Sequence, residues 1–183
     1  MKYSLWLSLS VAALVFGLFW PRSQVLAEEL KIGAPAPDFT LPDARGQQRR
    51  LTDFNGEWLL LYFYPKDDTP GCTKEACTFR DGYQELRRRG VQVVGVSVDD
   101  STSHQAFAQK YNLPFPLLSD SDGQVAKRYG AFWSLGPIHF AKRHSFLIDV
   151  QGRIARIYRS VDPDTHYRQV LDDLERMSSA TTH

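Results

Sequence analysis

Both cysteines of the chain, Cys72 and Cys77, fall in one short stretch with four residues between them. Pro70 precedes the first cysteine by two positions, after an apolar run and a polar turn. Because proline is favoured in the first turn of a helix, a helix is expected to begin there. A thiol near a helix start faces free N–H groups and the positive end of the helix dipole, which favour the thiolate. The pattern predicts a nucleophilic cysteine at position 72.

The two cysteines admit either a redox pair or an ordinary structural disulfide, and their number alone does not separate these interpretations. The geometry of the expected helix does separate the two interpretations. Five residues of a regular helix give a rise of about 7.5 Å and a rotation of about 140°, which separates the two Cα atoms by about 8 to 9 Å. A disulfide requires less than about 7 Å. We therefore predict a transient disulfide, formed only after the first helical turns unwind.

A redox pair of this kind suits the reduction of a peroxide. A thiolate that attacks a peroxide oxygen becomes a sulfenic acid, which condenses with a second thiol to a disulfide. This chemistry needs two cysteines, and we expect no metal and no organic cofactor. It also needs donors aimed at the peroxide oxygens and at the oxygen that leaves with negative charge. Candidate donors are the Thr69 hydroxyl, the N–H groups of Gly71 and Cys72, and one arginine, and Pro65 is expected to wall the pocket.

The elements around this stretch alternate between strands and helices. Residues 58–64 are apolar on both faces, as in a central buried strand. A helix is expected over 70–89, with an apolar stripe at Ala76, Phe79, Tyr83 and Leu86. Further elements are expected as strands at 91–98 and 117–118, helices at 101–111 and 124–129, a hairpin over 144–158, and a helix from Pro163. This order predicts an α/β, thioredoxin-like fold: a mixed central sheet flanked by helices, with an N-terminal hairpin extension closed at residues 43–46.

Length and charge restrict the function classes. The 183 residues and 43% hydrophobic content fit one domain with a substantial core, expected over residues 28–183. The chain carries 22 basic and 21 acidic residues, so no excess of charge indicates nucleic acid or an acidic substrate as a partner.

Residues 1–27 differ from the rest of the chain and are expected to act in targeting. Lys2 precedes a long apolar run, and Val25 and Ala27 are small residues at the spacing that a signal peptidase accepts, so cleavage before Glu28 is expected. The run is long for the apolar region of a signal peptide and slightly short for a spanning helix of about 20 residues, so an uncleaved membrane anchor is the alternative. Both outcomes place the domain in the periplasm or another extracytoplasmic compartment, the thylakoid lumen if the source is photosynthetic.

Residues 64–77, YPKDDTPGCTKEAC, resemble the active-site segment of the peroxiredoxins, specifically the peroxiredoxin Q or bacterioferritin comigratory protein type. The resemblance continues in segments 34–39 (APAPDF), 94–97 (VGVS), 117–120 (LLSD) and 143–149 (RHSFLID). It covers about residues 31–175 as one domain.

The resemblance implies an antioxidant enzyme, a thioredoxin-dependent thiol peroxidase for hydrogen peroxide and organic hydroperoxides. It implies that Cys72 is the peroxidatic cysteine and Cys77 the resolving one, joined in an intramolecular disulfide that a thioredoxin-like dithiol reduces. Pro65, Thr69 and Arg143 would complete the pocket. It also implies a monomer, with the membrane as a partner only if the N-terminal segment is retained.

Two other functions would use a similar fold. A membrane-tethered copper chaperone would bind its ion through two thiolates and a histidine. A disulfide reductase would normally carry Cys-x-x-Cys, whereas position 75 is Glu, expected here only to favour the helix start. Residues 130–142 depart most from the family, and their aromatic residues are expected either to pack under a loop or to form a lip for bulky hydroperoxides or a docking surface for a reductant.

Overall fold

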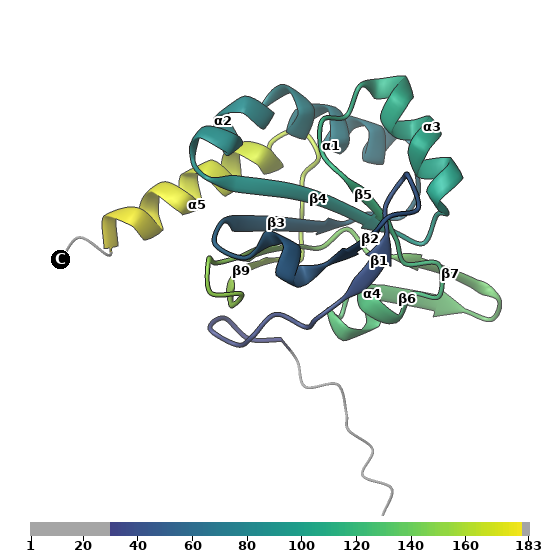
Figure 1. The fold of residues 1–183 in the computed structure, drawn as a ribbon, viewed down its shortest axis with the longest axis horizontal. Coiled ribbons are helices and arrows are strands. Elements are labelled where there is room, and N and C mark those ends of the chain that lie inside the picture. Colours follow the sequence, from purple (N-terminus) through teal and green to yellow (C-terminus); the bar gives the residue numbers. More distant parts are fainter. Residues whose placement is uncertain (1–29, 181–183) are drawn as a thin grey trace, which may run out of the picture.

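The computed structural model describes residues 30–180, which form a twisted five-stranded sheet with helices on both faces (Figure 1). The strands are β3 (Trp58–Phe63), β4 (Val91–Ser97), β5 (Leu117–Ser119), β8 (Ser145–Ile148) and β9 (Ile154–Tyr158), in the spatial order β5-β4-β3-β8-β9. β3 runs parallel to β4, and β4 to β5, whereas β8 pairs antiparallel with both β3 and β9. The expected mixed sheet of a thioredoxin-like fold is confirmed.

Each face of the sheet has its own apolar core because side chains alternate along β3. Leu60 and Tyr62 face the core beneath α1 (Pro70–Asp81), α2 (Tyr83–Arg88), α3 (Ser101–Tyr111) and α5 (His166–Ala180). Leu59 and Phe63 face the opposite core, which α4 (Gln124–Arg128) and the N-terminal segments cover. In Figure 1, α1, α2 and α3 lie above the sheet, while α4 and the β6-β7 hairpin lie below it.

The N-terminal hairpin is present, with β1 (Thr40–Pro42) paired to β2 (Gln48–Arg50). The buried Asp43 closes the turn, since its carboxylate accepts hydrogen bonds from the N–H groups of Arg45 and Gln47. Directly after β2 the chain forms the 3-10 helix η1 (Leu51–Phe54).

The single helix expected over 70–89 is wrong, because the structure divides it at Gly82 into α1 and α2. The Tyr167 ring of α5 packs against Gly82 so closely that a Cβ there would stand 2.4 Å from it. The last helix also begins later than expected, at His166 instead of Pro163.

Residues 130–142 were expected to be a loop, and this too is wrong. They contain an antiparallel hairpin, β6 (Phe132–Leu135) and β7 (Ile138–Ala141), which turns at Gly136 and Pro137. Gly136 has φ 59°, a left-handed conformation that glycine adopts without steric cost.

The N-terminal targeting segment, residues 1–27, lies outside the described residues. Within 30–180, no helix is long and apolar enough to cross a membrane.

Candidate active site

Cys72 lies in the first turn of α1, which follows the carboxyl end of β3 after a short turn. The side chain is only 2% exposed. The first intrahelical bond of α1 runs from the N–H of Thr73 to the carbonyl of Thr69, at 2.8 Å. The N–H groups of Gly71 and Cys72 precede this bond, so they have no partner within the helix. The expected nucleophile therefore lies beside two backbone donors.

Arg143 reaches Cys72 from the connection between β7 and β8. Its Nη2 donates a hydrogen bond to Cys72 Sγ at 3.3 Å. A Cβ at Gly71 would stand 3.2 Å from the same Nη2, so the missing side chain makes room for the guanidinium. Because a guanidinium is a fixed cation with a rigid set of donors, it stabilises a thiolate at this position. The structure thus brings together two of the expected site residues.

Glu75 is the ion-pair partner of the Arg143 guanidinium. Its side chain is fully buried and forms an ion pair with Arg143 Nη1. Burial raises the pKa of Glu75 to about 7, although Arg143 opposes the shift. The sequence-based interpretation, a helix-start electrostatic effect, missed this role. A usable signal was present, since Glu75 follows Cys72 by three positions and therefore shares its face of the helix.

Tyr62 extends the buried cluster from β3. Its hydroxyl is buried and has no hydrogen-bond partner among residues 30–180. Burial raises the Tyr62 pKa well above its ordinary value, and negative charge on Glu75, Asp67 and Cys72 adds to this effect. The phenol therefore remains protonated and neutral beside the thiol.

Thr69 and Pro65 frame the turn that leads into α1. Thr69 is the N-cap residue, but its hydroxyl donates to the Lys66 carbonyl at 3.0 Å instead of capping the helix. An oxygen lone pair of the hydroxyl can still accept a hydrogen bond. Pro65 is partly buried directly after Tyr64. The pocket roles of both residues stay predictions.

The same turn is tied to α3 by a buried carboxylate that no sequence pattern singled out. Asp67 accepts hydrogen bonds from Tyr64 at 2.7 Å and Ser103 at 2.8 Å, and lies 2.9 Å from His104 Nδ1. These bonds to a negative carboxylate outweigh its desolvation and lower the Asp67 pKa. The arrangement fixes the path of the chain just before the helix that carries Cys72.

Cys77 lies one and a half turns further along α1 and is partly exposed. Both cysteines are free thiols, and an unbroken helix contains them both. Two contacts from the segment before α5 cover this part of the helix. Thr78 donates to the Pro163 carbonyl at 2.9 Å, and Lys74 pairs with Asp164 at 2.7 Å.

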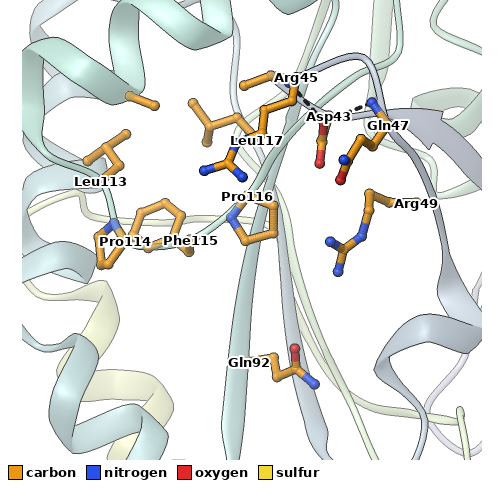
Figure 2. A pocket seen from close by; sticks show the side chains of 12 residues that line it. Asp43, Arg45, Gln47, Arg49, Gln92, Leu113, Pro114, Phe115, Pro116 and Leu117 are labelled. Atoms are coloured by element: carbon orange, nitrogen blue, oxygen red, sulfur yellow. Dashed lines mark hydrogen bonds between the residues drawn. The ribbon is translucent and has the colours of Figure 1, made fainter.

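A cavity of about 460 Å³ lies away from this site, between the β1-β2 hairpin and the edge of the sheet at β5 (Figure 2). Its lining combines the polar residues Arg45, Arg49 and Gln92 with the apolar segment before β5. It contains neither cysteine, so it is separate from the thiol chemistry. Elsewhere in residues 30–180, no three His, Cys, Asp or Glu side chains come close enough to hold a metal ion.

A family model, a curated relative and solved structures all match most of this chain, and they are described as related proteins. A family model described as the AhpC/TSA family matches residues 32–157. A putative peroxiredoxin bcp of Coxiella burnetii (strain RSA 493 / Nine Mile phase I) is 46% identical over 151 residues, which are 79% of this chain and 99% of the relative. The crystal structure of peroxidoxin BcpB from Mycobacterium tuberculosis superposes with a TM-score of 0.76 at 35% identity, covering 81% of this chain and 98% of that one. The bacterioferritin comigratory protein of Xanthomonas campestris, which has alkyl peroxide reduction activity, gives a TM-score of 0.73 at 32% identity, covering 81% and 97%.

Proposed function

This chain belongs to the AhpC/TSA family, among relatives named peroxiredoxin Q and bcp, and we propose that Cys72 is the thiol with which it attacks peroxides. Family membership makes it a thiol-dependent peroxidase, an antioxidant oxidoreductase. It does not favour the copper chaperone or the disulfide reductase. The observation that carries the assignment of Cys72 is the hydrogen bond from Arg143 to its sulfur at the start of α1.

The proposed reaction has three balanced steps. The Cys72 thiolate attacks one peroxide oxygen and the O–O bond breaks, leaving Cys72 as a sulfenic acid and releasing an alkoxide or hydroxide that takes up a proton. The Cys77 thiol then displaces water from the sulfenic acid and forms the disulfide. An external dithiol, in the manner of thioredoxin, exchanges with the disulfide and restores both thiols.

Arg143 and the helix N–H groups serve the first step. The guanidinium stabilises the thiolate before attack, and the N–H groups of Gly71 and Cys72 are aimed where negative charge develops on the leaving oxygen. Thr69 is proposed to accept a hydrogen bond from the O–H of the incoming hydroperoxide, and Pro65 to exclude water. The alkyl peroxide reduction activity of the Xanthomonas campestris protein supports alkyl hydroperoxides as substrates beside hydrogen peroxide.

Substitution of each cysteine tests the assignment. Cys72→Ser is expected to abolish peroxide consumption. Cys77→Ser is expected to retain one rapid stoichiometric burst and to lose recycling by thioredoxin. Normal thioredoxin-dependent turnover in the Cys77 variant would overturn its role as the resolving thiol, and residual turnover in the Cys72 variant would overturn the whole scheme.

We further propose that the protein is exported and acts as a monomer outside the cytoplasm. Lys2, the apolar run and the small residues at Val25 and Ala27 support export. Mass spectrometry of the native protein should find a mature N-terminus at Glu28, and a retained Met1 would indicate an anchor. Sedimentation equilibrium of the reduced protein should give the mass of one chain.

A further inference from the structure

The β6-β7 hairpin carries an unusual share of the exposed apolar surface. Five large hydrophobic side chains are exposed within residues 30–180, and three of them lie on this hairpin. These are Leu135 at 68% exposure, Ile138 at 62% and Trp133 at 36%. The hairpin projects sideways from the body of the domain in Figure 1. Exposed apolar side chains scattered singly are ordinary, whereas a cluster at the tip of a projecting element indicates a contact surface.

The strand register places the apolar side chains on one face. Trp133 pairs with Phe140, and Leu135 pairs with Ile138. In an antiparallel pair, directly opposite residues and alternate residues of one strand point to the same side, so all four side chains lie on one face of the hairpin. The rings of Trp133 and Phe140 stack at 4.6 Å. We refer to Trp133, Leu135, Ile138 and Phe140 as the outward face.

The other face attaches the hairpin to the domain. Ala141 is fully buried, and Phe132 packs against the core beside α4. The His139 ring lies near the Phe132 ring and its Nε2 lies 3.2 Å from the Ser121 carbonyl oxygen. Since one face is anchored, the outward face is directed away from the protein's own core.

The hairpin and the segments that flank it in sequence carry basic residues and no acidic ones, although the whole chain is nearly neutral. Residues 123–148 contain no Asp or Glu, and the nearest acidic positions in the sequence are Asp122 and Asp149. The same segment contains four basic residues, Lys127, Arg128, Lys142 and Arg143, of which Arg143 is already paired with the buried Glu75. Lys142 is exposed at the base of the hairpin, and the Lys127 ammonium lies 4.6 Å from the Phe132 ring centre. An apolar tip with the exposed Lys142 at its base matches the layers of an anionic bilayer surface, where acyl chains lie beneath acidic headgroups.

We propose that the outward face of the β6-β7 hairpin inserts into the surface of bilayers that contain anionic phospholipids. Trp133 sits at the headgroup level, as tryptophan does in membrane proteins, and Leu135 and Ile138 enter the acyl boundary. Arg143, which contacts Cys72, follows β7 by two residues, so docking brings the reactive thiol to the membrane surface. In a part of the proposal that rests on the proposed peroxidase function, the substrates there are phospholipid hydroperoxides. The Cys72 thiolate takes the distal oxygen and becomes a sulfenic acid, the O–O bond breaks, and the lipid leaves as an alkoxide that takes up a proton to become an alcohol.

Vesicle binding by residues 28–183 tests the docking directly. A chain of this extent folds on its own, since the matched part of this chain amounts to 99% of the Coxiella burnetii relative and 98% of the crystallised mycobacterial protein. The protein should float with vesicles of phosphatidylcholine and phosphatidylglycerol and bind pure phosphatidylcholine more weakly. In a Trp58→Phe background, the fluorescence of Trp133 should shift to shorter wavelength when these vesicles are added.

Matched variants identify the surface responsible. Leu135→Ser with Ile138→Ser should weaken binding by about tenfold or more, because two apolar side chains no longer leave water. Lys142→Gln should weaken binding to the anionic vesicles by about fivefold. The control, Ile32→Ser with Val150→Ser, removes two exposed apolar side chains elsewhere and should bind like the wild type.

The outcomes separate the docking from the chemistry. Equal vesicle binding by the wild type and the Leu135/Ile138 variant would overturn the proposal, and so would a wild-type dimer that this variant converts to a monomer. The variant should reduce hydrogen peroxide in solution as fast as the wild type does, and reduce phospholipid hydroperoxides in anionic vesicles more slowly. Equal rates in vesicles would overturn the substrate assignment alone. A wild type that binds vesicles but consumes no peroxide of any kind would refute the peroxidase function and leave the docking intact.

Discussion

Glu75→Gln tests whether a buried carboxylate positions the arginine that activates Cys72. Burial raises the Glu75 pKa from 4.5 to about 7, against the opposing effect of Arg143. The folded protein therefore binds the Glu75 proton more tightly than the unfolded chain does. A raised carboxyl pKa makes the free energy of unfolding fall as pH rises from about 4.5 through 7, because the proton that favours the folded state is lost.

The size of this effect follows from the two pKa values. A shift from 4.5 to about 7 corresponds to about 3 kcal/mol between the protonated and ionised forms. Between pH 5 and pH 8, the folded state should lose about 2 to 3 kcal/mol through this group. His166 acts in the opposite direction. Burial lowers its pKa from 6.5 to about 4, so its contribution is present above 6.5 and is lost as pH falls toward 4.

Urea unfolding of the wild type and Glu75→Gln at pH 5 and pH 8 isolates the carboxyl group, since His166 is common to both proteins. Relative to the wild type, the variant should gain about 2 to 3 kcal/mol of stability on going from pH 5 to pH 8. Glu175→Gln, an exposed carboxylate on α5, is the control and should follow the wild type. Identical pH dependence in the wild type and Glu75→Gln would refute the raised pKa.

The catalytic consequence is measured separately. Hydrogen bonds between charged groups contribute about 1.5 to 3 kcal/mol, so loss of the Glu75 anchor should slow the reaction of Cys72 with peroxide by about tenfold or more. Stopped-flow measurement of peroxide consumption under pseudo-first-order conditions reports this step. An unchanged rate would show that Arg143 keeps its position without Glu75.

Three further predictions concern the same region. Arg143→Lys should slow the peroxide reaction in stopped flow and leave thioredoxin reduction of the preformed disulfide unchanged, because a lysine cannot bond Cys72 and Glu75 in the same fixed geometry; equal losses in both steps would contradict this. Gly82→Ala should lower the free energy of unfolding by about 1 to 3 kcal/mol in urea, since its Cβ would stand 2.4 Å from the Tyr167 ring, and full stability would show that the ring moves aside. Oxidation should increase hydrogen exchange in α1 and not in β3, and equal protection of α1 in both redox states would exclude helix opening.

Local patterns were sufficient to predict much of the fold. The run that became β3 is apolar on both faces because the strand is covered by a core on each side. Pro70 marked the helix start two residues before Cys72, and the structure begins α1 there. The hairpin at residues 132–141 was missed although Gly136 and Pro137 are a turn signal and Trp133-Ser134-Leu135 and Ile138-His139-Phe140 alternate as strands do, because both arms are short and their apolar face is the exposed one.

Long-range contacts account for what the sequence could not reveal. The Glu75–Arg143 pair joins residues 68 positions apart, and the Asp67–His104 contact joins residues 37 apart. Although its spacing from Cys72 placed Glu75 on the same helix face, nothing in the sequence identifies Arg143 as the partner of Glu75 or His104 as the partner of Asp67. The break at Gly82 is also tertiary in origin, because the ring that occupies the space comes from α5. The site residues that could be named in advance were those in a contiguous motif or in a segment similar to the family.

The hydrogen bond that activates Cys72 also couples the stability of α1 to the oxidation state of its sulfur. In the reduced protein, Arg143 binds Cys72 and Glu75 together and so joins the first turn of α1 to the β7-β8 connection. A sulfenic acid is uncharged and is a weaker partner for a guanidinium than a thiolate, so oxidation loosens this attachment. The remaining restraints near Cys77 are the Thr78 bond to the Pro163 carbonyl and the exposed Lys74–Asp164 pair, which is of the kind that contributes about 1 kcal/mol or less. In the proposed cycle, peroxide attack at Cys72 thereby favours the unwinding that Cys77 requires.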